Sequence, residues 1–259
     1  MLVIAKKHGI IVLKDVSKHF QLGETTIKAL DSIDLAVCEG DFITVMGPSG
    51  SGKTTLLDVL STMLQPTSGQ VFVEGTETSS MDNAEISGFR GGKIGFIFQA
   101  FNLLPKLTAI ENVMVPMWIN QVSKEDRFER AKELMERVGL GDRLYNKPNQ
   151  LSGGQRQRVA IARSLALDPT IIVADEPTGN LDSKSEEQIM QILFDLNRKD
   201  GKTILLVTHE ISIGKRSKKQ LYLRDGEVWK AIGFENCPMR KKKIGKKSPK
   251  PAAKRGAKR

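Results

Sequence analysis

The segment Gly47 to Thr54 constrains the fold of this chain more strongly than any other, because it matches G-x-x-x-x-G-K-[ST] at every fixed position. In such a segment, backbone N–H groups of a glycine-rich turn point inward at phosphates, and the lysine reaches the outer phosphate oxygens. The threonine hydroxyl can bind Mg²⁺. The sequence therefore predicts a nucleoside triphosphate site. Its predicted binding residues are Gly47, Pro48, Ser49, Gly50, Ser51, Gly52, Lys53, Thr54 and Thr55.

The residues on either side of this loop fit a strand that enters it and a helix that leaves it. The strand is predicted by the apolar residues Phe42, Ile43, Val45 and Met46. The helix is predicted by apolar residues at helical spacing, namely Leu56, Leu60, Met63 and Leu64. A helix that begins at the loop directs the positive end of its dipole at a bound anion.

The remaining pattern predicts further strands and helices. The first hundred residues are expected to hold this one helix and strands at 10–16, 30–37, 71–73 and 94–98. From Ala100 the pattern becomes helical, with a capping box at Ser123 and Asp126 and another helix from Gln155. Apolar strands at 171–174 and 203–207 flank a helix that opens with Ser183 and Glu186. This order predicts a parallel sheet covered on both faces.

Two carboxylates, Asp175 and Glu176, follow the apolar strand at 171–174. Acids at the end of a strand also occur simply for solubility, but together with a phosphate loop they indicate a metal and water site. Asp175 suits Mg²⁺, either directly or through water. Glu176 is then free to orient and deprotonate an attacking water molecule as a general base.

A second phosphate-binding helix start is predicted at Leu151 to Gln155, where a serine hydroxyl and two glycine amides precede a helix. The sequence Leu-Ser-Gly-Gly-Gln here resembles the signature of ATP-binding-cassette (ABC) ATPases. In that family, the signature of one subunit closes over ATP held by the phosphate loop of the other, so two copies enclose two ATP molecules head-to-tail. The resemblance implies ATP binding in trans by Ser152, Gly153, Gly154 and Gln155, and by Asp182 in the D-loop.

The resemblance covers residues 10 to about 230 and implies roles for single residues as well. Gln99 resembles the Q-loop glutamine, which meets Mg²⁺ and the attacking water and lies beside the membrane partner. His209 resembles the switch histidine that senses the γ-phosphate. Phe20 takes the place of the aromatic ring that stacks on adenine, which is commonly a tyrosine, although a core or surface role fits Phe20 equally well. The implied catalytic residues are Glu176, His209 and Gln99, and the implied metal ligands are Thr54, Gln99 and Asp175.

The implied fold is α/β: a P-loop NTPase (RecA-like) core with an antiparallel β subdomain and an inserted α-helical subdomain at about residues 100–166. The ABC nucleotide-binding domain is expected to span residues 1–232. Ala100 and Glu210 depart from the residues that close relatives often carry, without a functional consequence. The implied activity is hydrolysis of ATP with Mg²⁺.

Within the family, the motif sequences most resemble those of the lipoprotein-release and macrolide-export (MacB/LolD-like) branch, for example at residues 98–105, 107–113 and 177–183. No apolar stretch of 18 residues occurs, so the resemblance implies a separate membrane permease and a protein that is cytoplasmic and peripheral on the inner face of the membrane. The sequence does not identify the cargo. A GTPase is disfavoured, because Asn146-Lys147-Pro148-Asn149 lacks the aspartate of N-K-x-D. The main alternative is a soluble ABC ATPase acting on nucleic acid or ribosomes.

The positive net charge of +10 comes from the C-terminal end of the chain. Residues 236–259 hold 11 of the 40 basic residues and no acidic residue. The segment 233–259 is therefore expected to be a disordered tail. Three roles remain open: a solvated tail with no specific role, contact with anionic lipid beside the permease, and binding of nucleic acid. The aromatic content of 5% disfavours nucleic acid, because it offers few rings for base stacking.

Overall fold

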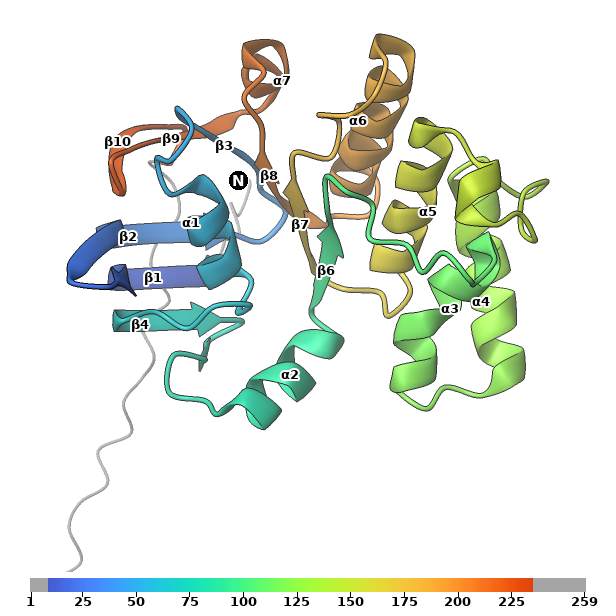
Figure 1. Ribbon diagram of the computed structural model, residues 1–259, viewed down its shortest axis with the longest axis horizontal. Coiled ribbons are helices and arrows are strands. Elements are labelled where there is room, and N and C mark those ends of the chain that lie inside the picture. The colour runs from blue at the N-terminus through green and yellow to red at the C-terminus, as the bar shows by residue number, and fades with distance from the viewer. Residues whose placement is uncertain (1–8, 235–259) are drawn as a thin grey trace, which may run out of the picture.

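The computed structural model describes residues 9–234, which form two sheets and a group of helices (Figure 1). The larger sheet has six strands in the order β10-β9-β3-β8-β7-β6. Neighbouring strands from β9 to β6 run parallel, and only β10 is antiparallel to its neighbour. Its strands are β3 (Phe42–Met46), β6 (Ile94–Ile97), β7 (Ile171–Asp175), β8 (Thr203–Val207), β9 (Lys219–Arg224) and β10 (Glu227–Ile232).

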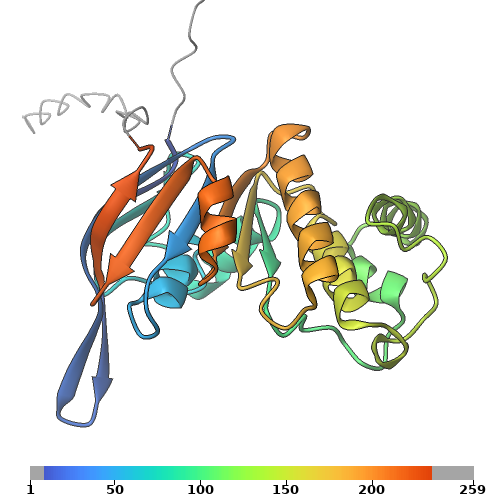
Figure 2. The ribbon, with the colours of Figure 1, turned by 90° about the horizontal axis from the view of Figure 1, so that it is seen from above.

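The second sheet is antiparallel and has four strands in the order β2-β1-β4-β5. They are β1 (Gly9–Leu22), β2 (Thr25–Cys38), β4 (Ser68–Val73) and β5 (Thr76–Glu77). The hairpin of β1 and β2 extends well beyond the rest of the sheet (Figure 2). The expected strands at 10–16 and 30–37 were therefore too short, because the polar, exposed part of the hairpin has no apolar alternation to reveal it.

Each face of the six-stranded sheet packs into its own apolar core. Along β7, Ile171 and Val173 lie in a core with helix α1 and the antiparallel sheet, whereas Ile172 and Ala174 lie in a core with helices α5 and α6. This alternation explains why the strand is apolar at successive positions, since side chains of a strand alternate between the two faces. The predicted parallel sheet, covered on both faces, is confirmed.

The helices gather in two groups. Helices α3, α4 and α5 pack together at one end of the molecule (Figure 1). The others flank the six-stranded sheet or join it to the antiparallel sheet. Their bounds are α1 (Lys53–Leu60), α2 (Asn83–Gly91), α3 (Ala109–Ile119), α4 (Lys124–Arg137), the 3₁₀ helix η1 (Pro148–Gln150), α5 (Gly153–Ser164), α6 (Ser183–Arg198) and α7 (Ile211–Arg216).

Two further expectations for the first hundred residues were wrong. Helix α1 ends at Leu60, and the exposed Met63 lies beyond it, because Thr62 adopts a left-handed φ of 61°. A second helix, α2, begins at the N-cap Asp82, whose carboxylate accepts hydrogen bonds from the N–H groups of Ala84 and Glu85. The capping residues were visible in the sequence, but Ile86 is the one buried residue of this helix, so its pattern shows no apolar face.

The later helices agree more closely with prediction. Ser123 caps α4 by accepting a hydrogen bond from the N–H of Asp126. Helix α6 is capped by Asp182, one residue before the expected start. Among residues 9–234, no helix has the length and apolar character needed to cross a membrane. Most of the predicted basic tail, from residue 235 onward, lies outside the described residues.

Candidate nucleotide-binding site

The predicted phosphate loop connects the end of β3 to the start of α1. Gly47 and Gly52 have φ values of 153° and 96°. A Cβ atom would lie 2.3 Å from the carbonyl oxygen of Leu223 at the first position and 2.3 Å from that of Ala29 at the second. Both positions therefore require glycine, because backbone atoms of neighbouring strands leave no room for a side chain.

The loop presents donors that fit an anionic ligand. Helix α1 has Gly52 as N-cap and no side-chain cap, which leaves its first N–H groups available to a ligand. Lys53 folds back over the loop and its Nζ donates to the carbonyl of Pro48 at 2.8 Å. The Oγ of Ser51 is buried and has no hydrogen-bond partner among the described residues. These features fit a cradle for phosphate oxygens.

A pair of oxygen ligands adjoins the loop at the end of β7. The Oγ1 of Thr54 donates to Oδ2 of Asp175 at 3.4 Å. Burial raises the pKa of Asp175, and the charge of Glu176 raises it further, while Thr54 and Lys53 oppose the shift. Burial and the charge of Asp175 also raise the pKa of Asp58. Hydroxyl and carboxylate oxygens suit Mg²⁺, and the surplus of negative charge would favour a cation.

Glu176, His209 and Gln99 converge next to this pair. The Oε2 of Glu176 lies 3.5 Å from Nδ1 of His209. A Cβ atom built on Gly179 would be 2.8 Å from Nε2 of Gln99 and 3.5 Å from Oε2 of Glu176, so both side chains border the same small space. Glu176 has a left-handed φ of 42°, which is uncommon outside glycine and is found at functional sites. Three elements thus bring a carboxylate, an amide and an imidazole together.

The predicted trans-acting residues form a second cluster. Ser152 caps α5 by accepting from the N–H of Gln155 at 3.2 Å, and Oε1 of Gln155 accepts from the N–H of Ser152 at 2.9 Å. Asp182 caps α6 through its carboxylate, which accepts from the N–H of Ser185 at 3.0 Å and from its hydroxyl at 2.7 Å. A Cβ atom on Gly154 would lie 2.6 Å from Oγ of Ser185, so the two helix starts pack directly against each other.

This second cluster is separated from the phosphate loop of its own chain. Helices α1 and α5 lie on opposite sides of strands β7 and β8 in both views (Figures 1 and 2). Phe20 lies on the long hairpin, where its ring is 41% exposed and its cross-strand partner is Ile27. Lys18 approaches this ring, with Nζ 5.3 Å from the centroid. The exposed ring is accessible for stacking.

Sequence reasoning missed three side chains of α5, Arg156, Gln157 and Arg163, which contact residues on either side of Gln99. One signal was available, since Gln157 is a polar residue on the buried face of a helix and is fully buried in the structure. The destination of its hydrogen bond was not visible in the sequence.

Comparison with known proteins identifies the family. Residues 30–179 match the family model described as ABC transporter. The chain belongs to the ABC transporter ATP-binding family. It is 50% identical over 222 residues to the uncharacterized ABC transporter ATP-binding protein MJ0796 of Methanocaldococcus jannaschii, covering 84% of this chain and 94% of that protein. The predicted family and its ATP-binding cassette fold are therefore confirmed.

One further relative bears on the macrolide-export resemblance, and a solved structure of MJ0796 bears on the fold. Macrolide export ATP-binding/permease protein MacB of Bdellovibrio bacteriovorus is 47% identical over 220 residues, which are 84% of this chain and 33% of MacB. A dimeric post-hydrolysis structure of the MJ0796 cassette, bound to ADP and Pi, superposes with a TM-score of 0.79 at 47% identity, covering 85% of this chain and 97% of that one. This chain is an ABC ATPase whose cofactors are ATP and Mg²⁺.

Proposed function

We propose that this chain is the ATP-hydrolysing subunit of a transporter, that two copies enclose two ATP molecules head-to-tail, and that the dimer drives a separate membrane permease. The observation that carries the proposal is the capped start of α5, which lies across the sheet from the phosphate loop of its own chain. A second phosphate-binding helix start serves a purpose if it closes over a nucleotide bound by another copy. The MJ0796 structure, which is dimeric and bound to ADP and Pi, supports the proposal of a dimer.

In the proposed mechanism, the glycine-rich loop and Lys53 hold the triphosphate, and Thr54, Asp175 and Gln99 would hold Mg²⁺. When bound, this ion would supply positive charge next to the phosphate oxygens. Glu176 accepts a proton from the attacking water molecule, and His209, 3.5 Å away, holds Glu176 and the γ-phosphate in register. Ser152 and Gly153 of the second copy complete the phosphate contacts and exclude water. Phe20 provides a surface for adenine.

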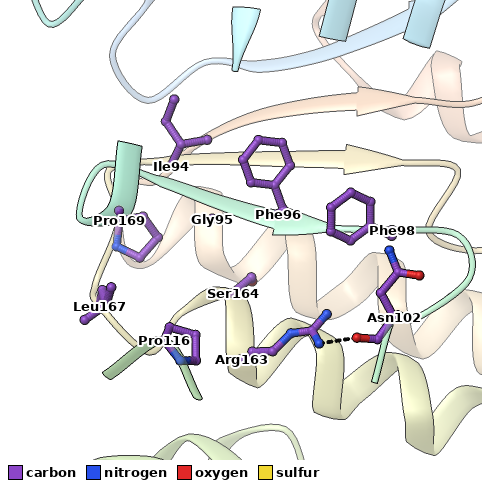
Figure 3. A pocket seen from close by; sticks show the side chains of 11 residues that line it. Ile94, Gly95, Phe96, Phe98, Asn102, Pro116, Arg163, Ser164, Leu167 and Pro169 are labelled. Carbon is purple, nitrogen blue, oxygen red and sulfur yellow. Dashed lines mark hydrogen bonds between the residues drawn. The ribbon is translucent and has the colours of Figure 1, made fainter. Parts of the chain in front are cut away.

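A surface next to the Q-loop supports the proposed permease contact. A cavity of about 300 Å³ lies between β6, α3 and α5 and is lined mainly by apolar side chains (Figure 3). Pro116 of the cavity lies on α3, and the same helix carries the exposed apolar residues Trp118 and Ile119, at 65% and 73%. A permease segment seated here would lie beside the loop that carries Gln99, which would place the protein on the inner face of the membrane.

The name of one relative supports a permease as the partner. This chain covers 94% of MJ0796 but only 33% of MacB, whose name combines an ATP-binding part with a permease. The relatives in the comparison are ABC transporter proteins, so the alternative of a soluble ATPase acting on nucleic acid or ribosomes gains no support.

A mixing experiment tests the composite site. Ser152→Arg blocks the signature end of one chain, and Lys53→Ala removes the phosphate-binding lysine from another. Each variant alone is expected to be inactive. Their mixture is expected to regain part of the ATPase activity, because one composite site then has both an intact Lys53 and an intact Ser152. The proposal is contradicted if the mixture stays inactive although sedimentation detects mixed dimers. It is also contradicted if Ser152→Arg alone has full ATPase activity.

A further inference from the structure

The loop that follows Gln99 is held in an unusual backbone conformation. Phe101 and Asn102 both adopt left-handed φ values, of 61° and 48°. For two consecutive residues other than glycine, this conformation is sterically unfavourable. Within the loop, the N–H of Asn102 donates to the carbonyl of Ala100 at 2.7 Å, and the N–H of Phe101 donates to that of Phe98 at 3.2 Å. The turn therefore needs support from outside the loop to persist.

That support comes from one helix, α5. Arg163 donates through Nη2 to the carbonyl of Phe101 at 2.9 Å. Through Nη1 it donates to the carbonyl of Asn102, as Figure 3 shows. Burial lowers the pKa of Arg163, as expected for a guanidinium enclosed by protein. A planar fork of this kind fits two successive carbonyl groups, which a lysine cannot do. The two left-handed residues thus share one charged donor.

Two more side chains of α5 contact the same loop. Gln157, which is fully buried, donates through Nε2 to the carbonyl of Phe98 at 3.4 Å. The guanidinium carbon of Arg156 lies 5.2 Å from the ring centroid of Phe101. Gln99 therefore lies between Phe98 and Phe101, both of which are attached to the helix whose first residues form the signature.

We infer that Arg163 is a positioning residue for hydrolysis: it fixes the turn at Phe101 and Asn102 to helix α5, so that Gln99 is placed by the position of the signature helix. Contact of Ser152 with a nucleotide on another copy is thereby transmitted along α5 to Gln99, which borders the same space as Glu176. This inference rests on the proposed roles of Gln99 and Ser152. It adds a link between the two predicted clusters within one chain.

The test is a double-mutant cycle between Arg163 and Gln99. Arg163→Lys keeps the charge and loses the fork, and it is expected to lower kcat about tenfold or more while KM for ATP stays within about twofold, because the phosphate loop is untouched. In a Gln99→Ala background, Arg163→Lys is expected to cause no further loss, since Arg163 acts through Gln99. If Arg163→Lys instead acted independently of Gln99, by damaging the structure, the losses of kcat from the two substitutions would multiply in the double variant.

Arg158 provides the matched control. It lies on the same helix and donates to the carbonyl of Val138 at 3.3 Å, away from the Q-loop. Arg158→Lys is expected to leave kcat unchanged. If Arg163→Lys fails to fold, Gln157→Met removes the other side-chain hydrogen bond to the loop at similar volume, and its kcat loss should likewise vanish in the Gln99→Ala background.

The outcomes separate this inference from the proposed function. If Gln99→Ala lowers kcat but Arg163→Lys does not, the inference is overturned and the proposed function stands. The same holds if the two losses of kcat multiply in the double variant. A Gln99→Ala variant with the wild-type rate overturns the role proposed for Gln99 and the inference with it. Equal losses of kcat in Arg163→Lys and Arg158→Lys also overturn the inference, because they would show a general effect of disturbing α5.

Discussion

The Oε2 atom of Glu176 lies 3.5 Å from Nδ1 of His209, although 33 residues of sequence separate the two. The parallel pairing of β7 and β8 produces this proximity, because Glu176 follows β7 and His209 follows β8 by two residues. The N–H of Glu176 also donates to the carbonyl of Val207 at 3.1 Å, which anchors the left-handed backbone at Glu176 to β8. The carboxylate is thus presented by the sheet itself.

Glu176→Gln is expected to separate ATP binding from hydrolysis. The amide keeps the shape of the side chain but cannot accept a proton from water, so kcat should fall by about 10² to 10⁴ while ATP binding persists. The variant should also form an ATP-dependent dimer that sedimentation can detect. Lys53→Ala is the contrasting control, because loss of this charge should weaken ATP binding itself. Near wild-type turnover by Glu176→Gln would show that another group accepts the proton.

Asp175→Asn is expected to stabilise the nucleotide-free and Mg²⁺-free protein near neutral pH. The pKa of Asp175 is raised in the folded state by burial and by the charge of Glu176. Between the ordinary and the raised pKa, the folded protein therefore keeps a proton on Asp175 that the unfolded chain has released. Stability of the wild type therefore falls as pH rises from the ordinary aspartate pKa to the raised one. The gain from asparagine should grow over that range and disappear below it. Urea denaturation at several pH values, with Mg²⁺ chelated, measures this effect.

Asp168→Asn is the control for the pH experiment. A hydrogen bond from Lys202 lowers the pKa of Asp168, so its contribution to stability is present above the ordinary aspartate pKa and is lost as pH falls. Its replacement should therefore destabilise the protein slightly near neutral pH, because the carboxylate is 76% exposed. An Asp175→Asn variant that is less stable than wild type throughout the pH range would contradict the prediction. Asp175→Asn, which removes a proposed metal ligand, should also lose Mg²⁺-dependent ATP hydrolysis.

Short-range chemistry explains which parts of the fold and site could be predicted from the sequence. Three features depend on residues within one segment: the phosphate loop, the strand before Asp175 and the start of α5. The structure has the loop between β3 and α1, the strand β7 and the helix α5 at these places. Contacts across the fold had no such signal. Arg163 and Asn102 are 61 residues apart, and their hydrogen bond exists because α5 packs against β6 and the loop that follows it.

Ser152→Asp is expected to distinguish the cap of α5 from the proposed contact with phosphate. Aspartate caps a helix about as well as serine, so the free energy of unfolding should change by less than about 0.5 kcal/mol. Its charge should nevertheless repel the γ-phosphate on another copy and abolish steady-state ATPase activity. Ser152→Ala gives the opposite pattern, with a loss of about 1 kcal/mol in stability from the missing cap and retention of some activity. Full ATPase activity of Ser152→Asp would show that the γ-phosphate does not bind at this helix start.

Contact with anionic lipid, one of the three roles that the sequence leaves open for the C-terminal basic segment, predicts binding through charge. Residues 236–259 hold 11 basic side chains and no acidic one, and each basic residue near an anionic surface contributes about 1 kcal/mol. The full-length protein should therefore co-sediment with phosphatidylserine vesicles at low salt, while a version that ends at Cys237 should not. High salt should remove most of the difference, because charge interactions at the surface are screened.

Phosphatidylcholine vesicles and single-stranded DNA serve as controls for this experiment. Neutral vesicles should bind the full-length and shortened versions equally weakly, since only charge distinguishes the two proteins. Equal binding of both versions to phosphatidylserine vesicles would contradict a lipid role for the segment and leave a solvated tail as its description. Preferential binding of the full-length protein to DNA at matched charge would instead favour nucleic acid as its partner. The low aromatic content argues against that result, because single bases would find few rings on which to stack.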